Sequence, residues 1–275
     1  MPATNRNGFT LIELSIVLVI IGLIVGGVLM GKDLIRASEV RATISQIEQY
    51  NAAVNTFRGK YNGIPGDLMY TEAQAFGLYR ITNASYIGYP GYGDGNGLIR
   101  SANGASPPSS ATQLYGEPLM FWRHLSEAKL INGNYGAGLN AGAEATGTSG
   151  LDAMNKYLPA AKLTGSTIAV GSPLDGKNYF LLTKAIDIVG VGAFWTSENP
   201  LTASEAYLMD SKIDDGLPAS GTVFAIDAIS ATTSSNGLNA PATWKTVSAV
   251  AGCVASSVYA VTQTTQSCSL RIKFQ

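Results

Sequence analysis

The carboxylate of Glu13 lies next to a long apolar run, where a charge is costly. The run from Leu14 to Met30 contains one Ser, three Gly and no charged residue. As a helix it would extend ~25 Å, close to the ~30 Å hydrocarbon core of a membrane. A carboxylate in such a segment normally indicates function and a partner. Glu13 is therefore the first candidate functional residue, and a Glu tolerated at the lipid headgroups is the alternative.

Two other groups of side chains could take part in chemistry. Asp94-Gly95-Asn96-Gly97 offers oxygen ligands on alternate residues with glycines between them, as calcium loops do. The match is short, so we prefer a glycine turn, with calcium at Asp94 and Asn96 as the alternative. No other cofactor is expected. His124 is the single histidine, and a catalytic base would also need a nucleophile and an orienting acid. We therefore predict a structural role for His124 and no enzymatic activity.

Composition favours an exported, β-rich domain. Hydrophobic residues make up 46% of the 275-residue chain, charged residues only 13%, and there are 31 glycines. The formal net charge of -1 provides no basic surplus to attract a nucleic-acid backbone, so no nucleic-acid partner is predicted. One histidine and two cysteines also exclude a His/Cys zinc site.

The apolar run continues into a sequence that is typical of an amphipathic helix. No proline occurs between Thr10 and Ile64, and Pro65-Gly66 then stops helical structure. The spacing predicts one continuous helix of about 50 residues, roughly 75 Å long. Its second half carries a single apolar stripe that should hold a globular domain. The stripe consists of Val40, Ile44, Ile47, Val54, Phe57 and Tyr61.

The leader MPATNRNG followed by Phe9-Thr10-Leu11-Ile12-Glu13 and an apolar helix resembles the type IV pilin and type II secretion pseudopilin family. The resemblance is close over residues 6 to about 61. It implies that a prepilin peptidase cuts after Gly8 and that the new amine of Phe9 is methylated. It also implies that Glu13 pairs with the Phe9 amine of a neighbouring subunit and so sets the axial register, because a wrong stagger leaves both charges unpaired.

The resemblance further implies partners and a location. The partners are homologous subunits, the prepilin peptidase, the inner-membrane assembly platform and membrane lipid. The protein should be a single-pass inner-membrane protein with a periplasmic head, and later part of a pilus or pseudopilus. The number of basic residues on each side of the apolar run alone would not place the N-terminus in the cytoplasm, because the more basic side normally lies there. Only Arg6 precedes the apolar run, whereas three basic residues follow it closely: Lys32, Arg36 and Arg41.

The expected division of the chain follows from these features. Residues 1–8 form the leader, residues 9–61 the long helix with 9–30 in the membrane or filament core, and residues 62–275 the head. In the head, helices are expected at Glu117 to Ile131 and after the capping box Thr202 to Glu205. Strands are expected at Tyr179 to Leu182, Thr222 to Ile226, Ser256 to Val261 and Ser269 to Phe274.

Cys253 and Cys268 are the only cysteines, and a single late pair in an exported protein predicts one disulfide. The pair also resembles the C-terminal disulfide loop of many pilins. The expected fold is therefore α+β, with the long N-terminal helix packed on an antiparallel sheet that has large loop insertions. The expected function is a filament subunit. A membrane-anchored periplasmic binding module that does not polymerise and a tethered hydrolase are the competing hypotheses.

Overall fold

The computed structural model describes residues 10–80, 93–100, 116–136, 154–172, 175–189, 194–226 and 252–274. The helices are α1 (Leu11–Tyr61), α2 (Tyr70–Ala75), α3 (Glu117–Glu127) and α5 (Ala203–Ile213). The strands are β1 (Thr167–Gly171), β2 (Tyr179–Val189), β3 (Phe194–Glu198), β4 (Leu201–Thr202), β5 (Val223–Ile226), β6 (Val254–Ala255), β7 (Val258–Tyr259) and β8 (Gln266–Lys273).

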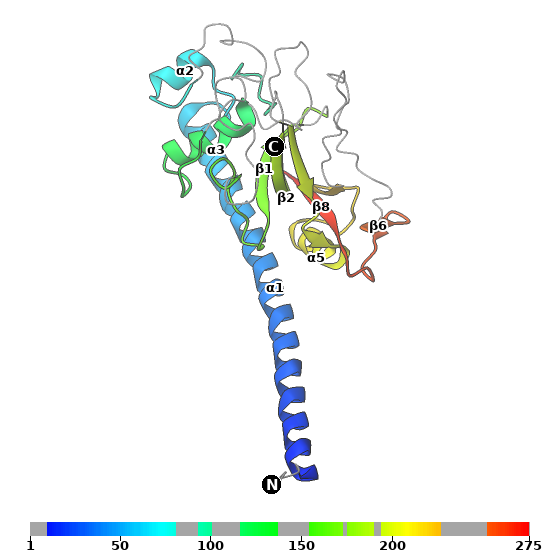
Figure 1. Ribbon diagram of the computed structural model, residues 1–275. Coiled ribbons are helices and arrows are strands. Elements are labelled where there is room, and N and C mark those ends of the chain that lie inside the picture. The colour runs from blue at the N-terminus through cyan, green and yellow to red at the C-terminus, as the bar shows by residue number, and fades with distance from the viewer. Residues whose placement is uncertain are drawn as a thin grey trace, which may run out of the picture.

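The long N-terminal helix is confirmed. In Figure 1 the first half of α1 stands away from the head, and its second half runs along one side of it. The helix ends where Asn62 adopts a left-handed conformation (φ 56°) and its N–H donates to the carbonyl of Arg58. A left-handed residue followed by Pro65 cannot continue an α-helix. The chain therefore leaves α1 just before the predicted Pro65-Gly66 stop.

The apolar stripe of α1 forms one wall of the core. Val40, Ile47, Val54, Phe57 and Tyr61 are buried, and Ile44 is half-buried against the same cluster. The ring of Tyr50 on α1 packs against the ring of Trp122 on α3, with 5.0 Å between the ring centroids. The rings of Phe180 on β2 and Phe274 pack with 4.4 Å between their centroids. Aromatic contacts of this kind dominate core energetics because each ring buries a large apolar area.

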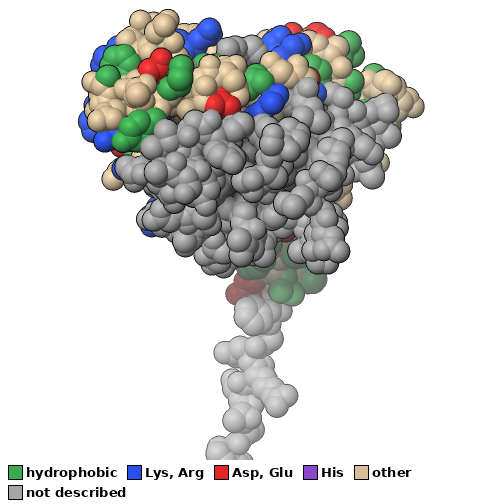
Figure 2. Space-filling model, turned by 90° about the horizontal axis from the view of Figure 1, so that it is seen from above, with side chains coloured by type: hydrophobic (Ala, Val, Ile, Leu, Met, Phe, Trp, Pro, Cys, Tyr) green, Lys and Arg blue, Asp and Glu red, His purple; other side chains and the backbone are tan. Residues whose placement is uncertain are grey.

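The sheet is antiparallel, with β2 and β8 at its centre. β8 pairs with β2 on one side, where Leu270 lies opposite Leu182, and with β5 on the other. β1 extends the sheet beyond β2, β3 pairs with the later part of β2, and β4 pairs with the start of β8. A long helix packed beside an antiparallel sheet confirms the predicted α+β, pilin-like fold. Seen from above in Figure 2, the described part of the head shows basic and acidic side chains scattered among neutral ones.

Two predictions for the end of the chain need correction. The single strand predicted from Ser256 to Val261 is wrong, because Ser256 and Ser257 adopt positive φ angles and join β6 to β7 as a tight hairpin. In the predicted strand at Ser269, the alternation of Leu270 and Ile272 with Arg271 predicts a half-buried strand with Arg271 on the solvated face, but Arg271 is buried. Its guanidinium lies 4.8 Å from the ring centroid of Tyr179 and 4.6 Å from that of Phe224, at cation–π distance.

Candidate assembly helix and its junction with the head

The first half of α1 has no protein cover in the single chain. An 18-residue window of this helix has a mean hydropathy of 2.8, and none of the window is buried. From Leu11 to Met30 the helix is ~30 Å long, enough to cross the hydrocarbon layer. The large apolar side chains of this stretch are all exposed. The segment therefore has the length and composition of a single membrane span.

Glu13 lies at the first turn of this span and already has donors in its own chain. The backbone N–H and the hydroxyl of Thr10 each donate to Oε2 of Glu13 at 2.8 Å. The N–H of Glu13 donates back to the Thr10 hydroxyl at 3.3 Å. This is a capping box, which satisfies donors that the helix start would leave unpaired. Glu13 therefore caps α1 in the single chain. This role was not predicted, although the Thr-x-x-Glu spacing of a capping box is visible in the sequence.

The cleavage and methylation residues that the sequence predicts, Gly8 and Phe9, lie outside the described residues. The described chain begins at Thr10, whose extended backbone (φ -78°, ψ 152°) forms the N-cap of α1. Thr10 follows directly after the proposed new N-terminus at Phe9.

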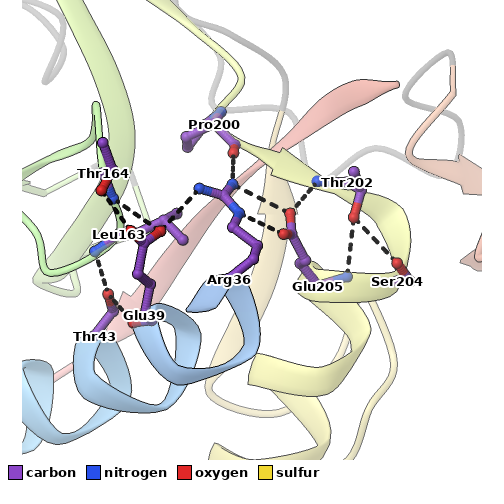
Figure 3. A network of polar contacts seen from close by, with 9 residues as sticks. All are labelled: Arg36, Glu39, Thr43, Leu163, Thr164, Pro200, Thr202, Ser204 and Glu205. Carbon is purple, nitrogen blue, oxygen red and sulfur yellow. Dashed lines mark hydrogen bonds and ion pairs between the residues drawn. The ribbon is translucent and has the colours of Figure 1, made fainter. Parts of the chain in front are cut away.

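The head is fastened to α1 at the point where the helix leaves it. The guanidinium of Arg36 donates to both carboxylate oxygens of Glu205, at 2.6 and 3.3 Å, and to the carbonyl of Pro200 at 2.7 Å. Figure 3 shows Arg36 reaching from α1 to the start of α5. Glu205 also accepts the N–H of Thr202 and so completes the predicted capping box of α5. One carboxylate thus serves both the helix cap and the junction.

The junction continues along the same face of α1 (Figure 3). Glu39 accepts from the hydroxyl of Thr164 at 2.5 Å, and the buried hydroxyl of Thr43 accepts the N–H of Leu163 at 2.8 Å. One turn further, Gln46 donates to the carbonyl of Ala160 at 2.9 Å. The contacts recur every three or four residues, which is the spacing of one helix face. We call Arg36, Glu39, Thr43 and Gln46 the polar seam.

The loop that contains the candidate calcium ligands is held by two buried carboxylates. Asp67 accepts the N–H groups of Gly95 and Gly97 at 2.9 and 2.7 Å. Glu117, at the start of α3, accepts those of Gly93 and Arg100 at 2.9 and 2.8 Å. These four hydrogen bonds hold the backbone of residues 93–100 in place. Neither carboxylate was singled out from the sequence, because both partners are distant along the chain.

Asp94 approaches this pair of carboxylates, whereas Asn96 closes its own turn. One oxygen from each of Asp67, Asp94 and Glu117 lies within 4.8 Å of the others. The amide oxygen of Asn96 accepts the N–H of Leu98 at 2.7 Å, and its amide nitrogen donates to Asp94 at 2.8 Å. Burial, together with the nearby charge of Asp94, raises the pKa of Asp67 to about 7. Burial also raises the pKa of Glu117 well above its ordinary value.

The single histidine joins two backbone segments inside the head. Nδ1 of His124 accepts the N–H of Gly66 at 2.9 Å, and Nε2 lies 2.7 Å from the carbonyl of Tyr79. A carbonyl only accepts, so Nε2 carries the proton and the ring is neutral. Burial lowers the pKa of His124, which keeps it neutral. His124 is buried on α3, and both of its ring nitrogens are used to hold backbone groups. This arrangement agrees with the predicted structural role.

The predicted disulfide is present between Cys253 and Cys268, with the two Cα atoms 5.2 Å apart. It joins the β6–β7 hairpin to β8, the central strand of the sheet. Nearby, the hydroxyl of Tyr259 donates to the buried carboxylate of Asp210 at 2.7 Å. The C-terminal loop is thus attached to both the sheet and α5.

Residues 3–29 match the family model for the prokaryotic N-terminal methylation motif. No curated protein and no solved structure matches the chain. The motif, the long exposed helix with which it overlaps and the antiparallel head together support membership of the type IV pilin and pseudopilin family. The matched residues end within the apolar half of α1, so the match does not extend to the head.

Proposed function

We propose that the chain is a structural subunit of a type IV pilus or a type II secretion pseudopilus. A prepilin peptidase would cut after Gly8, and the amine of Phe9 would then be methylated. The observation that carries the proposal is the uncovered apolar half of α1, most of which lies within the methylation motif. The twenty residues from Leu11 to Met30 are exposed and almost all apolar, so this stretch is stable only in lipid or against other helices. A filament subunit uses the two environments in succession.

Assembly would place the α1 helices of many copies side by side. Glu13 would then exchange or extend its bonds from Thr10 to the Phe9 amine of a neighbour, and an incorrect stagger would leave that amine unpaired in an apolar setting. Before assembly the subunit would wait in the inner membrane with its head in the periplasm. Its partners would be other subunits, the peptidase, the assembly platform and lipid. The role is structural rather than catalytic.

Intact-mass and N-terminal peptide analysis of the protein from native membranes tests this proposal. A chain that begins at N-methylated Phe9 is expected. A chain that still begins at Met1, in cells with an active prepilin peptidase, would exclude the filament role and leave an anchored periplasmic domain.

One observation favours the anchored binding module as a second candidate. A cavity of about 490 Å³ opens beside the end of α1, and its wall combines Arg58 with the carboxylates of Asp67 and Glu72. Cavities that combine apolar walls with a few charged groups are the usual small-molecule sites. If the chain is such a module, it should be found as unpolymerised subunits in membranes in which the peptidase is active.

For the loop at Asp94 and Asn96 we propose a glycine turn that the two buried carboxylates fix in place. Gly93 has a φ of 83°, and a Cβ there would lie 2.3 Å from the carbonyl oxygen of Leu68. Calcium bound at Asp94 and Asn96 is the alternative. No other cofactor is proposed.

A further inference from the structure

The outer face of α5 carries apolar side chains that the described part of the head covers only in part, although the ring of Tyr207 lies 6.2 Å from that of Tyr259. Ala203, Ala206 and Met209 of this helix are buried in the core. Leu208 is 51% exposed and Tyr207 is 44% exposed. A helix on a globular domain normally turns such residues inward and leaves polar ones outside. The outer face of α5, defined here by Tyr207 and Leu208, therefore departs from that pattern.

This face points toward the apolar half of α1. In Figure 1, α5 lies at the end of the head nearest to the free half of α1. In the described chain, Arg36 is the most N-terminal residue of α1 that bonds to the head, and its partner is Glu205 on α5. Ala203 and Met209 turn one side of α5 to the core, and the helical period places Leu208 on the opposite side. Because the sheet lies above α5 in Figure 1, the side opposite the core faces the end of the head from which the free half of α1 extends.

The distance from the span to α5 matches the thickness of a headgroup layer. Arg36 lies six positions after Met30, the end of the apolar run, which corresponds to ~9 Å along the helix axis. The polar layer on each side of the hydrocarbon core is ~5–8 Å thick. Between these points Leu34 is 73% exposed and Ile35 is 62% exposed. Exposed apolar surface thus continues from the span up to the level of α5.

We infer that the outer face of α5 rests in the headgroup layer of the bilayer that α1 spans. The inference builds on the proposed membrane residence of the subunit. Tyrosine suits this depth, because its ring is apolar and its hydroxyl is polar, and leucine buries its side chain at the acyl boundary. The polar seam, through Arg36 and Glu205, holds α5 at a fixed height, so the contact fixes how the head lies on the membrane.

Depth-dependent quenching in vesicles tests this contact with the full chain. Both native cysteines are in the disulfide, so a Ser211→Cys variant, on the exposed side of α5, can carry one environment-sensitive fluorophore. The protein is placed in phosphatidylethanolamine–phosphatidylglycerol vesicles that contain headgroup spin-labelled lipid. We expect blue-shifted emission and strong quenching. Adding Leu208→Ser should reduce the quenching several-fold, because the side chain that enters the layer is lost.

A matched control uses Phe76, which is 47% exposed at the end of α2, on the far end of the head in Figure 1. A fluorophore at Phe76→Cys should stay unquenched, and Phe76→Ser should not affect the label at position 211. A label at position 211 that behaves like the one at position 76 would overturn the inference. So would a blue shift that depends on protein concentration and ignores spin-labelled lipid, since a second copy would then cover α5.

A third label separates this inference from the proposed function. A fluorophore at Val19→Cys, in the middle of the span, should be quenched by spin labels deep in the acyl chains. If position 19 is quenched and position 211 is not, the inference about α5 fails and membrane residence stands. If position 19 is not quenched either, both fail.

Discussion

The guanidinium of Arg36 and the carboxylate of Glu205 form a two-bond ion pair between residues 169 positions apart. Arg36 projects from α1 just beyond the apolar run, and Glu205 is the third residue of α5. Planar pairs of this kind are stronger and more directional than a single contact between point charges. The pair therefore couples the direction of the membrane helix to the orientation of the head.

A double-mutant cycle should detect this coupling. We expect Arg36→Gln and Glu205→Gln each to lower the free energy of unfolding, with a coupling energy of about 1 kcal/mol, because both side chains are only partly exposed and charged hydrogen bonds exceed neutral ones. Glutamine at position 205 can keep the cap with Thr202, so the cycle isolates the ion pair. Urea unfolding in detergent micelles, followed by tryptophan fluorescence, provides the measurement.

The pair of Lys184 and Glu198 is the control for that cycle. Its atoms are equally close at 2.6 Å, but Glu198 is well exposed to solvent. Exposed pairs typically contribute well under ~1 kcal/mol, so the control cycle should give little coupling. Equal coupling energies for the two pairs would contradict a special role for the Arg36–Glu205 contact.

Features that depend on residues close together in the sequence could be predicted, whereas contacts between distant residues could not. The long helix, its stripe and the capping box at Thr202 depend on residues a few positions apart, and all three are found in the structure. Arg36 and Glu205 are each visible in the sequence, but nothing local indicates that they meet. The same holds for Asp67 and Glu117, whose bonds to the loop at 93–100 span 17 to 30 positions.

Arg271 illustrates the same limit within a strand. Alternation correctly places Arg271 on the opposite face of the strand from Leu270 and Ile272. It does not reveal how many strands flank β8. Because β8 lies between β2 and β5, Tyr179 and Phe224 cover the face that was expected to be solvated. The exposure of that face was set by its neighbours in the sheet, which are remote in the sequence.

Reducing the disulfide should destabilise the head. The bridge between Cys253 and Cys268 spans 15 positions, and cross-linking a loop of this length contributes about 3 kcal/mol on the chain-entropy model. Thermal unfolding with and without reductant measures the loss. The double variant Cys253→Ser/Cys268→Ser should unfold at the temperature of the reduced wild type and should not respond to reductant. An unchanged midpoint on reduction would show that the hairpin is held by other contacts.

The stability of the head should fall as the pH rises through neutrality. Asp67 has a pKa of about 7 when folded, against 3.8 for the ordinary carboxyl group. The folded state therefore binds more protons, and the stability present below pH ~4 is lost as the pH rises through ~7. Asp67 faces Asp94 and Glu117 across the loop, and Arg58 and Glu72 line the adjoining cavity. Unfolding free energies measured between pH 5 and 8 should be flatter in Asp67→Asn.

His124 should have the opposite effect on the pH dependence of stability, and at lower pH. Its folded pKa is lowered by burial, so its contribution is present above the ordinary histidine pKa and is lost as the pH falls through the folded value. Replacing it by Gln, which can still accept one bond and donate another, should remove the acid-side loss of stability. A pH profile of His124→Gln identical to that of the wild type would exclude this group as the cause.

A calcium titration addresses the alternative interpretation of the loop. A cation among Asp67, Asp94 and Glu117 would replace the bound proton and raise the melting temperature at pH 8. If the loop is only a glycine turn, we expect calcium to change the melting temperature no more than magnesium does. A saturable calcium-specific rise that Asp94→Asn removes would establish a calcium site instead.

Glu13 has two roles that one pair of substitutions can separate. Glu13→Ala removes both the cap on Thr10 and the charge, whereas Glu13→Gln keeps an acceptor for the cap and removes only the charge. If pairing with the Phe9 amine of a neighbour drives assembly, both variants should fold normally and both should be excluded from filaments. Folding is checked by circular dichroism in micelles, and incorporation by immunoblotting of sheared filaments. Normal incorporation of Glu13→Gln would show that Glu13 serves assembly through the helix cap and not through its charge.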